Sequence, residues 1–488
     1  ICLMRKASYN LVMLLVMLIW CKSISAQELW DLRRCVEYAW EHNISVKQSD
    51  IQARIAQLTL DQSKLGRYPN VNFTNSTGTN FGRAVDPTTN LFVSSTLLFQ
   101  QYNFNVNALI YNFGNIKNQV LANQSSVLAA KQDVQTTKND IGLTVATTYL
   151  QVLLAKEQAR IAYTTMDLTR ARLTDTRKRV DAGSLPELNA LELESQFARD
   201  SATYINAYTT AEQNLLNLKA TLNLDAATVF DITVPPVELI PVDNIADLLP
   251  DVVYQMALQS QPQVKANDYR MESLRYSLKS AKAALNPSIN LFGGMGTNFA
   301  NPSIRNTIQP LGFANTGALV NVNGTNYPVQ APDFDIIRSK KSFGDMWTGW
   351  GNQLDQNFRQ NIGIQLSIPI FNGAQARTNY KRIELNIKGA QLTRDQALIT
   401  LKNNIYQAYV TARNAYERYN ASKRTLEITE KTFALAQKRY DAGLMSTIDY
   451  ITNQNNLFRA RIQKVADQYD YVFRMKVLEF YKGQGLRL

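Results

Sequence analysis

Paired acidic side chains are the residues of this 488-residue chain whose type and spacing come closest to catalytic chemistry. Two carboxylates in one site can act as general acid and base, and the candidates are Glu192 with Glu194 and Asp467 with Asp470. Both pairs lie in helical stretches with Lys and Arg nearby, a pattern typical of a solvated helix surface. The sequence therefore predicts a protein without catalytic activity.

Few residues are available for metal or phosphate chemistry. The chain has one histidine, His42, which is too few for a multi-histidine site, and three cysteines. Cys2 and Cys21 lie in an N-terminal segment that we expect to be removed, which leaves Cys35 alone and excludes a cysteine zinc site. It also lacks a glycine-rich phosphate loop that ends in Lys-Ser or Lys-Thr. We expect no metal, no cofactor and no nucleotide-driven chemistry in this chain.

Two glycine turns carry the next local pattern. Residues 178–183 read KRVDAG and residues 438–443 read KRYDAG. A serine with an acid three positions on follows each glycine, Ser184 in the first turn and Ser446 in the second. A glycine that ends one helix, followed by a capping box that begins another, predicts the tip of a helical hairpin.

The two turns belong to an internal repeat. They lie 260 residues apart (438 − 178), whereas the GTNF of residues 78–81 recurs at 296–299, an offset of 218 (296 − 78). The difference of 42 residues indicates an insertion in the second copy, and the whole pattern indicates a tandem duplication. The expected parts are a first repeat over residues 27–233, a Pro-rich linker over 234–250 and a second repeat over 251–488.

Each repeat contains strand-like alternation of apolar and polar residues, over residues 101–110 and again over 361–370. Ten residues of period-two alternation fit a tilted membrane strand with one face to lipid and the other to a lumen. A strand of a soluble sandwich has the same pattern and stays open as an alternative. We expect strand pairs within residues 69–113 and 287–371, and a long irregular loop, rich in Gly and Pro, over 301–356.

Four strands are too few to close a barrel, and open sheet edges are not tolerated in lipid. A membrane sheet of this size must therefore be completed by other copies of the chain. Three copies would supply twelve strands, which lies within the range of membrane barrels. The strand pattern thus predicts an oligomer in contact with membrane lipid, and a homotrimer is a size that would close the barrel.

The rest of the chain is predicted to be long helices. Apolar or small residues recur at steps of three and four from Leu398 to Tyr440, and the seam reappears 260 residues earlier, from Ile141 to Val180. Sustained heptads of this kind favour coiled-coil packing. The 67 residues from Ala374 to Tyr440 would form a helix of roughly 100 Å. The expected fold class is a mixed α/β membrane protein.

The N-terminus has the pattern of an export signal. Basic residues precede an apolar run over residues 11–20, and small residues up to Ala26 offer a cleavage site, so residues 1–26 are expected to be removed. Lipidation of Cys21 is a less favoured alternative, because the bulky Trp20 precedes it. The excess of 52 Lys and Arg over 40 Asp and Glu is spread without a basic block, which argues against nucleic-acid binding.

In combination these features resemble the TolC-like outer-membrane efflux protein family, also called outer membrane factors. The resemblance rests on the chain start at residues 29–43, the junctions at Tyr68-Pro69, Asn286-Pro287, Phe113-Gly114 and residues 371–373, and both DAG turns. It implies a trimeric twelve-stranded β-barrel in the cell outer membrane, continuous with a coiled-coil α-helical tunnel in the periplasm. It also implies a periplasmic adaptor (membrane fusion protein) and an inner-membrane transporter as partners in tripartite efflux or type I secretion.

The resemblance implies that the two turns dock the adaptor. The matching positions are Gly183, Ser184 and Leu185 in the first copy and Gly443, Leu444 and Met445 in the second. An exposed apolar pair such as Leu444 with Met445 at the tip of a rod has no packing role, which favours docking. The alternative is that both glycines serve only to end their helices.

Four residues lie at positions that correspond to the family's tunnel gate. Tyr440 and Asp449 match its constricting tyrosine and aspartate. Threefold symmetry would place three Asp449 carboxylates in a ring, which favours cations, although Asp449 is equally well explained as a capping-box acid. Met445 and Thr452 stand where the family has a basic residue and a second aspartate, so part of the usual charge network of the closed state is absent.

An outer-membrane exit duct is therefore the function that the sequence favours. A soluble periplasmic coiled-coil scaffold or adaptor is the alternative, although an adaptor has no use for two pairs of ten-residue strands. The cargo stays open among drugs, metals, siderophores and proteins.

Overall fold

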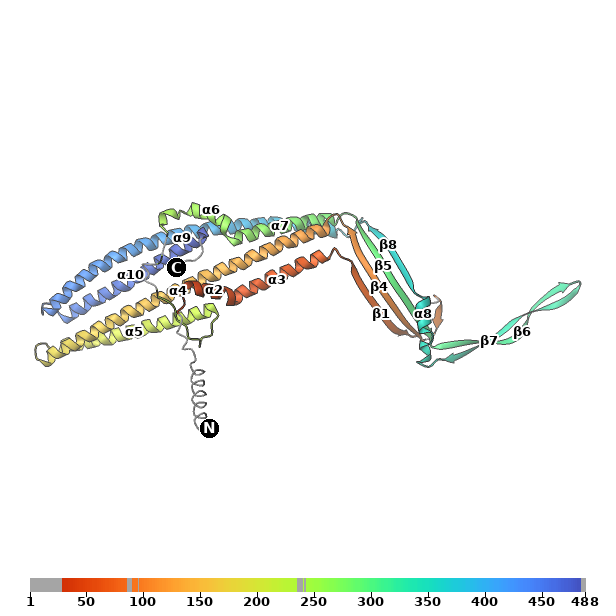
Figure 1. Cartoon of the computed structure of the whole chain (residues 1–488), viewed down its shortest axis with the longest axis horizontal. Helices are drawn as coiled ribbons and strands as arrows, with labels where there is room; N and C mark the ends of the chain where they lie inside the picture. The colour runs from red at the N-terminus through yellow and green to blue at the C-terminus, as the bar shows by residue number, and fades with distance from the viewer. Residues whose placement is uncertain (1–28, 86–89, 95, 235–239, 241–242, 484–488) are drawn as a thin grey trace, which may run out of the picture. The chain divides into compact units, whose positions relative to one another are not determined.

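A computed structural model describes residues 29–85, 90–94, 96–234, 240 and 243–483 (Figure 1). The expected export signal lies outside the described residues, as do 235–239 and 241–242 of the expected linker. The described residues divide into two compact units. A helical unit comprises the described residues within Ile1–Leu58, Asn123–Ser273 and Asn386–Leu488, and a strand-containing unit comprises those within Thr59–Ala122 and Leu274–Leu385.

The helices occur in pairs of equal length. Helices α4 (Asn115–Asp181) and α9 (Gln375–Asp441) each have 67 residues and start 260 apart (375 − 115). Each is followed by a helix of 36 residues, α5 (Glu187–Leu222) and α10 (Thr447–Lys482), again 260 apart (447 − 187). Four shorter helices of 11 or 22 residues repeat at an offset of 218: α2 (Leu32–His42), α3 (Ile44–Leu65), α6 (Pro250–Ser260) and α7 (Pro262–Ala283).

Within the described ranges, no helix combines the length and the apolar character needed to cross a membrane.

The buried side of α9 is the seam predicted from residue spacing. Six of its side chains are buried, and all six lie on that seam: Ile405, Ala412, Ala415, Ser422, Phe433 and Ala436. Four of them are Ala or Ser, and small residues let helix backbones approach closely. The heptad prediction is therefore confirmed for this helix.

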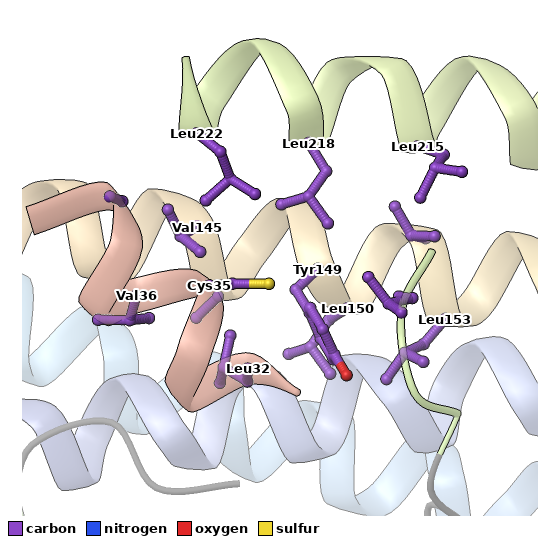
Figure 2. Close-up of a cluster of buried hydrophobic side chains, with 14 of the residues drawn as sticks. Leu32, Cys35, Val36, Val145, Tyr149, Leu150, Leu153, Leu215, Leu218 and Leu222 are labelled. Atoms are coloured by element: carbon purple, nitrogen blue, oxygen red, sulfur yellow. The ribbon is translucent and has the colours of Figure 1, made fainter. Parts of the chain in front are cut away.

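A buried apolar cluster joins three helices of the first half of the chain (Figure 2). Its labelled members are Leu32, Cys35 and Val36 of α2, Val145, Tyr149, Leu150 and Leu153 of α4, and Leu215, Leu218 and Leu222 of α5. The Tyr149 hydroxyl donates a 2.8 Å hydrogen bond to the Thr233 carbonyl. Trp30 and Ile232 form an isolated parallel bridge. These contacts fix the start of the described chain against the segment that follows α5.

The four long strands expected from the alternation form one antiparallel sheet in the order β1-β4-β5-β8. They are β1 (Asn70–Asn80), β4 (Leu97–Tyr111), β5 (Ser288–Pro302) and β8 (Arg359–Ser367). The last strand ends at Ser367 rather than continuing to residue 371, because Pro369 has no N–H for the ladder. Two consecutive residues with positive φ make each strand-to-helix junction, Phe113 with Gly114 and Gly373 with Ala374.

The segment over residues 301–356 is not the irregular loop that was expected. Most of it is an antiparallel hairpin of β6 (Ile304–Val322) and β7 (Thr325–Lys340). Asn323 and Gly324, both with positive φ, make its two-residue turn. The prolines and glycines that suggested a loop are tolerated because both strands are edges and the pairing shifts register twice.

A short helical segment follows this hairpin and covers one end of the sheet. It comprises a 3-10 turn (Asp345–Trp347) and α8 (Trp350–Gln356). Met346 packs on Leu98 of β4 and Phe299 of β5. A small additional hairpin, β2 (Arg83–Val85) with β3 (Phe92–Ser94), lies between β1 and β4 in the sequence.

Candidate functional site

The sheet has two chemically distinct faces, which follow from its pairing register. Val71, Phe104 and Ile362 lie on one face, and Asn105 and Asn361 on the other. We call the first the apolar sheet face. It comprises Val71, Phe73, Tyr102, Phe104, Val106, Ala108, Leu291, Gly293, Met295, Ile362, Ile364 and Leu366.

The apolar sheet face is exposed in the single chain. Ile362 is 81% exposed, Ile364 69% and Phe73 65%. Gly293 lies between Val106 and Ile362 in the register, and the missing side chain contributes to a groove of about 470 Å³ on the sheet. A contiguous apolar face of this kind marks contact with a membrane or another protein.

The opposite face, which we call the amide sheet face, is rich in Asn and Gln. Its amides are Asn70, Asn72, Asn80, Gln101, Asn103, Asn105, Asn107, Asn290, Asn298, Asn361 and Gln365. Two phenylalanines of this face each pack over a glycine of the neighbouring strand, Phe99 over Gly78 and Phe292 over Gly363. A Cβ atom at Gly363 would lie 2.5 Å from the Phe292 ring, so the ring uses that space.

The two hairpin tips have the same helix-ending geometry. Gly183 and Gly443 have φ of +73° and +74°. The N–H of the residue after each glycine donates to a carbonyl five residues earlier, Ser184 to Arg179 at 2.9 Å and Leu444 to Arg439 at 2.8 Å. This is the Schellman arrangement, in which a residue with positive φ ends the helix.

The helix starts after the two tips differ. Ser446 caps α10 as expected, because its hydroxyl oxygen accepts the N–H of Asp449. The expectation that Ser184 starts the first hairpin's second helix is wrong. Pro186 occupies the cap of α5, and the Ser184 hydroxyl donates instead to the Arg179 carbonyl. At the repeat offset, Ser446 corresponds to Pro186 (446 − 260).

The apolar side chains exposed at the tips are only partly the expected ones. Leu444 is 70% exposed, but Met445 is partly buried against the cluster that contains Tyr450, so the two do not form an exposed pair. Leu188 and Ile448 are 62% and 61% exposed. The sequence analysis missed this pair, although the repeat offset relates them (448 − 260 = 188).

The three gate candidates occupy different environments. Tyr440 is half-buried and stacks on Tyr450, with 4.6 Å between ring centroids. Asp449 is exposed, and its carboxylate accepts a 2.6 Å hydrogen bond from the Ser446 hydroxyl. Thr452 is exposed and donates to the Ile448 carbonyl at 2.8 Å. Asp449 and Thr452 therefore share an exposed side of α10, whereas Tyr440 packs against the buried cluster that contains Tyr450.

An ion pair links the two hairpins near this point. The Arg172 guanidinium of α4 lies 2.8 Å from the Asp441 carboxylate at the end of α9, and the Arg172 side chain is only 16% exposed. The same guanidinium lies over the Tyr450 ring, 5.7 Å from its centroid. Burial lowers the pKa of Arg172, but Tyr450 and Asp441 raise it, and the net change is upward.

A second link between the hairpins consists of buried hydrogen bonds. The Thr169 hydroxyl donates to the Asp200 carboxylate at 2.6 Å, and Gln196 donates to the same carboxylate at 2.7 Å. Gln454 of the other hairpin donates to the Thr169 hydroxyl at 2.6 Å. Sequence reasoning missed both links, because they join residues more than 250 positions apart and no local pattern marks them.

Among the acidic residues considered for catalysis, Glu194, Asp467 and Asp470 are engaged by neighbouring side chains of the helices. Asp470 forms ion pairs with Arg418 and Arg474, and Glu194 lies 3.5 Å from Arg177. Asp467 accepts hydrogen bonds from Gln463. The contacts of Asp470 and Glu194 fit the surface role inferred from the sequence, whereas Asp467 is buried and the surface prediction is wrong for it.

No group of three or more His, Cys, Asp or Glu side chains able to hold a metal occurs among the described residues. His42 stacks on Tyr38, with 4.0 Å between ring centroids. Cys35 is fully buried, and this burial raises the pKa of its thiol to about 12. Cys35 belongs to the buried apolar cluster of α2, α4 and α5, so its role is in packing.

Comparison with known proteins identifies the family. A family model described as outer membrane efflux protein matches residues 36–224 and 344–483, about two thirds of the chain. The outer membrane efflux protein BepC of Brucella suis biovar 1 is 20% identical over 444 residues, covering 89% of this chain and 81% of BepC.

Another relative matches a shorter stretch. The solvent efflux pump outer membrane protein SrpC of Pseudomonas putida is 28% identical over 128 residues. That match spans only a quarter of SrpC and of this chain, 25% of each.

A crystal structure of CusC shares the fold, with a TM-score of 0.69 at 17% identity over 94% of this chain and 95% of that one. The resemblance drawn from the sequence is thereby confirmed: the chain belongs to the outer membrane efflux protein family.

Proposed function

We propose that three copies of this chain form the exit duct of a tripartite efflux or type I secretion system. The observation that carries the proposal is the four-stranded sheet, with one exposed apolar face and two open edges, β1 and β8. Pairing of β8 in one copy with β1 of the next would close twelve strands and leave no edge in lipid. The apolar sheet face would then contact lipid, and the amide sheet face would line the lumen.

The chain is an outer-membrane protein, like its family. In the proposal, the long helices form a coiled-coil tunnel on the periplasmic side, continuous with the barrel. The chain has no enzymatic activity of its own, and its partners are a periplasmic adaptor and an inner-membrane transporter. Relatives are described as a solvent efflux pump component and an efflux protein, which supports export but leaves the cargo of this chain open.

Tandem duplication underlies this architecture in our proposal. Helices of 67 and 36 residues recur at an offset of 260, and helices of 11 and 22 residues recur at 218. Two independent sequences would not be expected to share four helix lengths in the same order. The β6–β7 hairpin accounts for most of the difference between the two offsets.

The two tips are the proposed adaptor-docking surface. Leu444 and Ile448 at one tip and Leu188 at the other expose apolar side chains that no described residue covers. Gly183, Ser184, Leu185, Gly443 and Met445 shape the two turns around them. For the gate, we propose that Asp449 faces the lumen, that Thr452 lies beside it, and that Tyr440 holds α9 against α10.

Cross-linking from the tip tests the proposal. We would replace Leu444 with cysteine, and as a matched control Leu392 of α9, which is 71% exposed and lies far along the helix. Outer-membrane trimers in which only the Leu444→Cys variant captures an adaptor and its transporter would support the duct. Recovery of the protein in the soluble periplasmic fraction without detergent would instead support the scaffold alternative, and equal capture by both variants would refute the tip assignment.

A further inference from the structure

The amide sheet face carries one charged side chain, Arg359, at the first residue of β8. Every other residue that the register places on this face of the four strands is an amide, a hydroxyl residue, a glycine or an apolar residue. No Asp, Glu or Lys occurs there. A wall of neutral amides with one arginine per chain is an unusual distribution for a chain with 52 Lys and Arg and 40 Asp and Glu.

No carboxylate in the part of the chain that the structure describes neutralises the Arg359 guanidinium, and the residue is exposed. Its pairing partner in β5 is Gly296. A Cβ atom at Gly296 would lie 3.5 Å from the Arg359 Nε and 3.0 Å from the Asn103 Oδ1, so the arginine side chain lies over this face of the sheet.

We propose that Arg359 makes the barrel lumen selective for anions, through a ring of three guanidinium groups contributed by the three copies. This inference deepens the proposed function and rests on the trimeric barrel. The neighbouring amides hydrate a passing solute without favouring either sign, so the ring sets the sign of the local potential. Rings of Arg or Lys favour anions in pores for the same reason that rings of Asp favour cations.

The expected size of the effect follows from Coulomb's law. For three charges roughly 10 Å from the pore axis, in water with salt of about 0.1 M, a monovalent anion is favoured about twofold over a neutral solute. The interaction energy is proportional to the charge of the solute. A tetra-anion is therefore favoured on the order of twentyfold under the same conditions.

The test is a planar-bilayer recording on purified full-length trimers. The proposed Asp449 ring has the opposite sign, so the experiment is done in an Asp449→Asn background to leave Arg359 as the charged ring under study. We would measure the reversal potential in a KCl gradient, and block by tripolyphosphate added to the barrel side. Arg359→Gln, Arg359→Lys and, as a control outside the four-stranded sheet, Arg338→Gln of β7 are compared.

We expect Arg359→Gln to lower the chloride-to-potassium permeability ratio about fourfold, because the ring favours chloride and disfavours potassium about twofold each, and to weaken tripolyphosphate block on the order of twentyfold. Arg359→Lys should keep both properties, because it keeps the charge, and Arg338→Gln should leave them unchanged. If Arg359→Gln does not assemble, Asn361→Arg on the same face provides the reverse test, and it should strengthen block.

The outcomes separate this inference from the proposed function. Open channels in which neither Arg359→Gln nor Asn361→Arg alters selectivity or block would overturn the anion ring and leave the duct intact. Absence of trimers and of channel activity in the parent protein would refute both.

Discussion

A lysine at Ile364 is predicted to prevent assembly in the membrane, whereas a lysine at the next residue, Gln365, is predicted to be tolerated. Ile364 lies on the apolar sheet face and is 69% exposed in the single chain, paired in register with Leu291. Gln365 points to the amide sheet face, paired with Asn290. The two positions are adjacent in the same strand and lie at nearly the same depth in the membrane. The two variants therefore differ mainly in the face of the sheet on which the lysine lies.

The magnitude follows from the position of Ile364 near the middle of β8. A lysine on the lipid face at mid-membrane costs about 2 to 4 kcal/mol per chain. Three chains per barrel give roughly 6 to 12 kcal/mol, which is comparable with the total stability of many folded domains. A lysine at Gln365 would reach the aqueous lumen and avoid this desolvation.

The assay is the yield of trimers extracted from the outer membrane in mild detergent, together with the denaturant midpoint of trimers refolded into lipid vesicles. We expect few or no trimers for Ile364→Lys and a near-normal yield for Gln365→Lys. Equal yields would contradict the lipid assignment of the apolar face. Loss of trimers for Gln365→Lys alone would mean that the two faces are assigned the wrong way round.

Three further predictions concern the helical unit. Arg172→Gln removes a largely buried partner of Asp441 and should weaken the closed tunnel by about 1 to 3 kcal/mol. Single-channel open probability would then rise several-fold or more. The control is Arg177→Gln, which removes an exposed ion pair with Glu194 at 3.5 Å and should change the open probability little. Asp449→Ala should reduce cation preference in bilayer recordings, and unchanged selectivity would rule out the acidic ring. Cys35, whose pKa burial raises to about 12, should resist maleimide at pH 8 in the folded protein and react after unfolding. Because its folded pKa lies above the usual value near 9, its contribution to stability is complete below pH 9 and is lost as the pH rises toward 12, which a series of denaturant midpoints at alkaline pH would detect.

Local sequence patterns account for the elements of this fold. Period-two alternation over residues 101–110 and 361–370 predicted the strands β4 and β8, because successive side chains of a strand point to opposite faces. Steps of three and four predicted the α9 seam, where Ile405 and Ala412 are fully buried. Gly183 and Gly443 marked the hairpin tips, because a residue with positive φ is favourable there only when it is glycine or asparagine.

Local patterns failed where pairing over a distance overrode composition. Pro310 and Gly312 suggested a loop, but they lie in β6, because an edge strand with a register shift does not need every N–H. Ser184 matched a capping box, yet the helix that follows starts after Pro186. Met445 looked exposed from its place in a turn, but it packs against the cluster around Tyr450.

The amino-acid sequence by itself determined the long helices, the four strands of the sheet, the repeat offsets and the family, because each depends on short-range periodicity or on motifs read in order. Only the tertiary structure decided which residues meet. The Arg172–Asp441 pair joins positions 269 apart (441 − 172), and the single charge on the amide sheet face became visible only through the register of four strands. Periodicity fixes which way a side chain points within its own element, whereas its neighbours depend on how distant elements pair and pack.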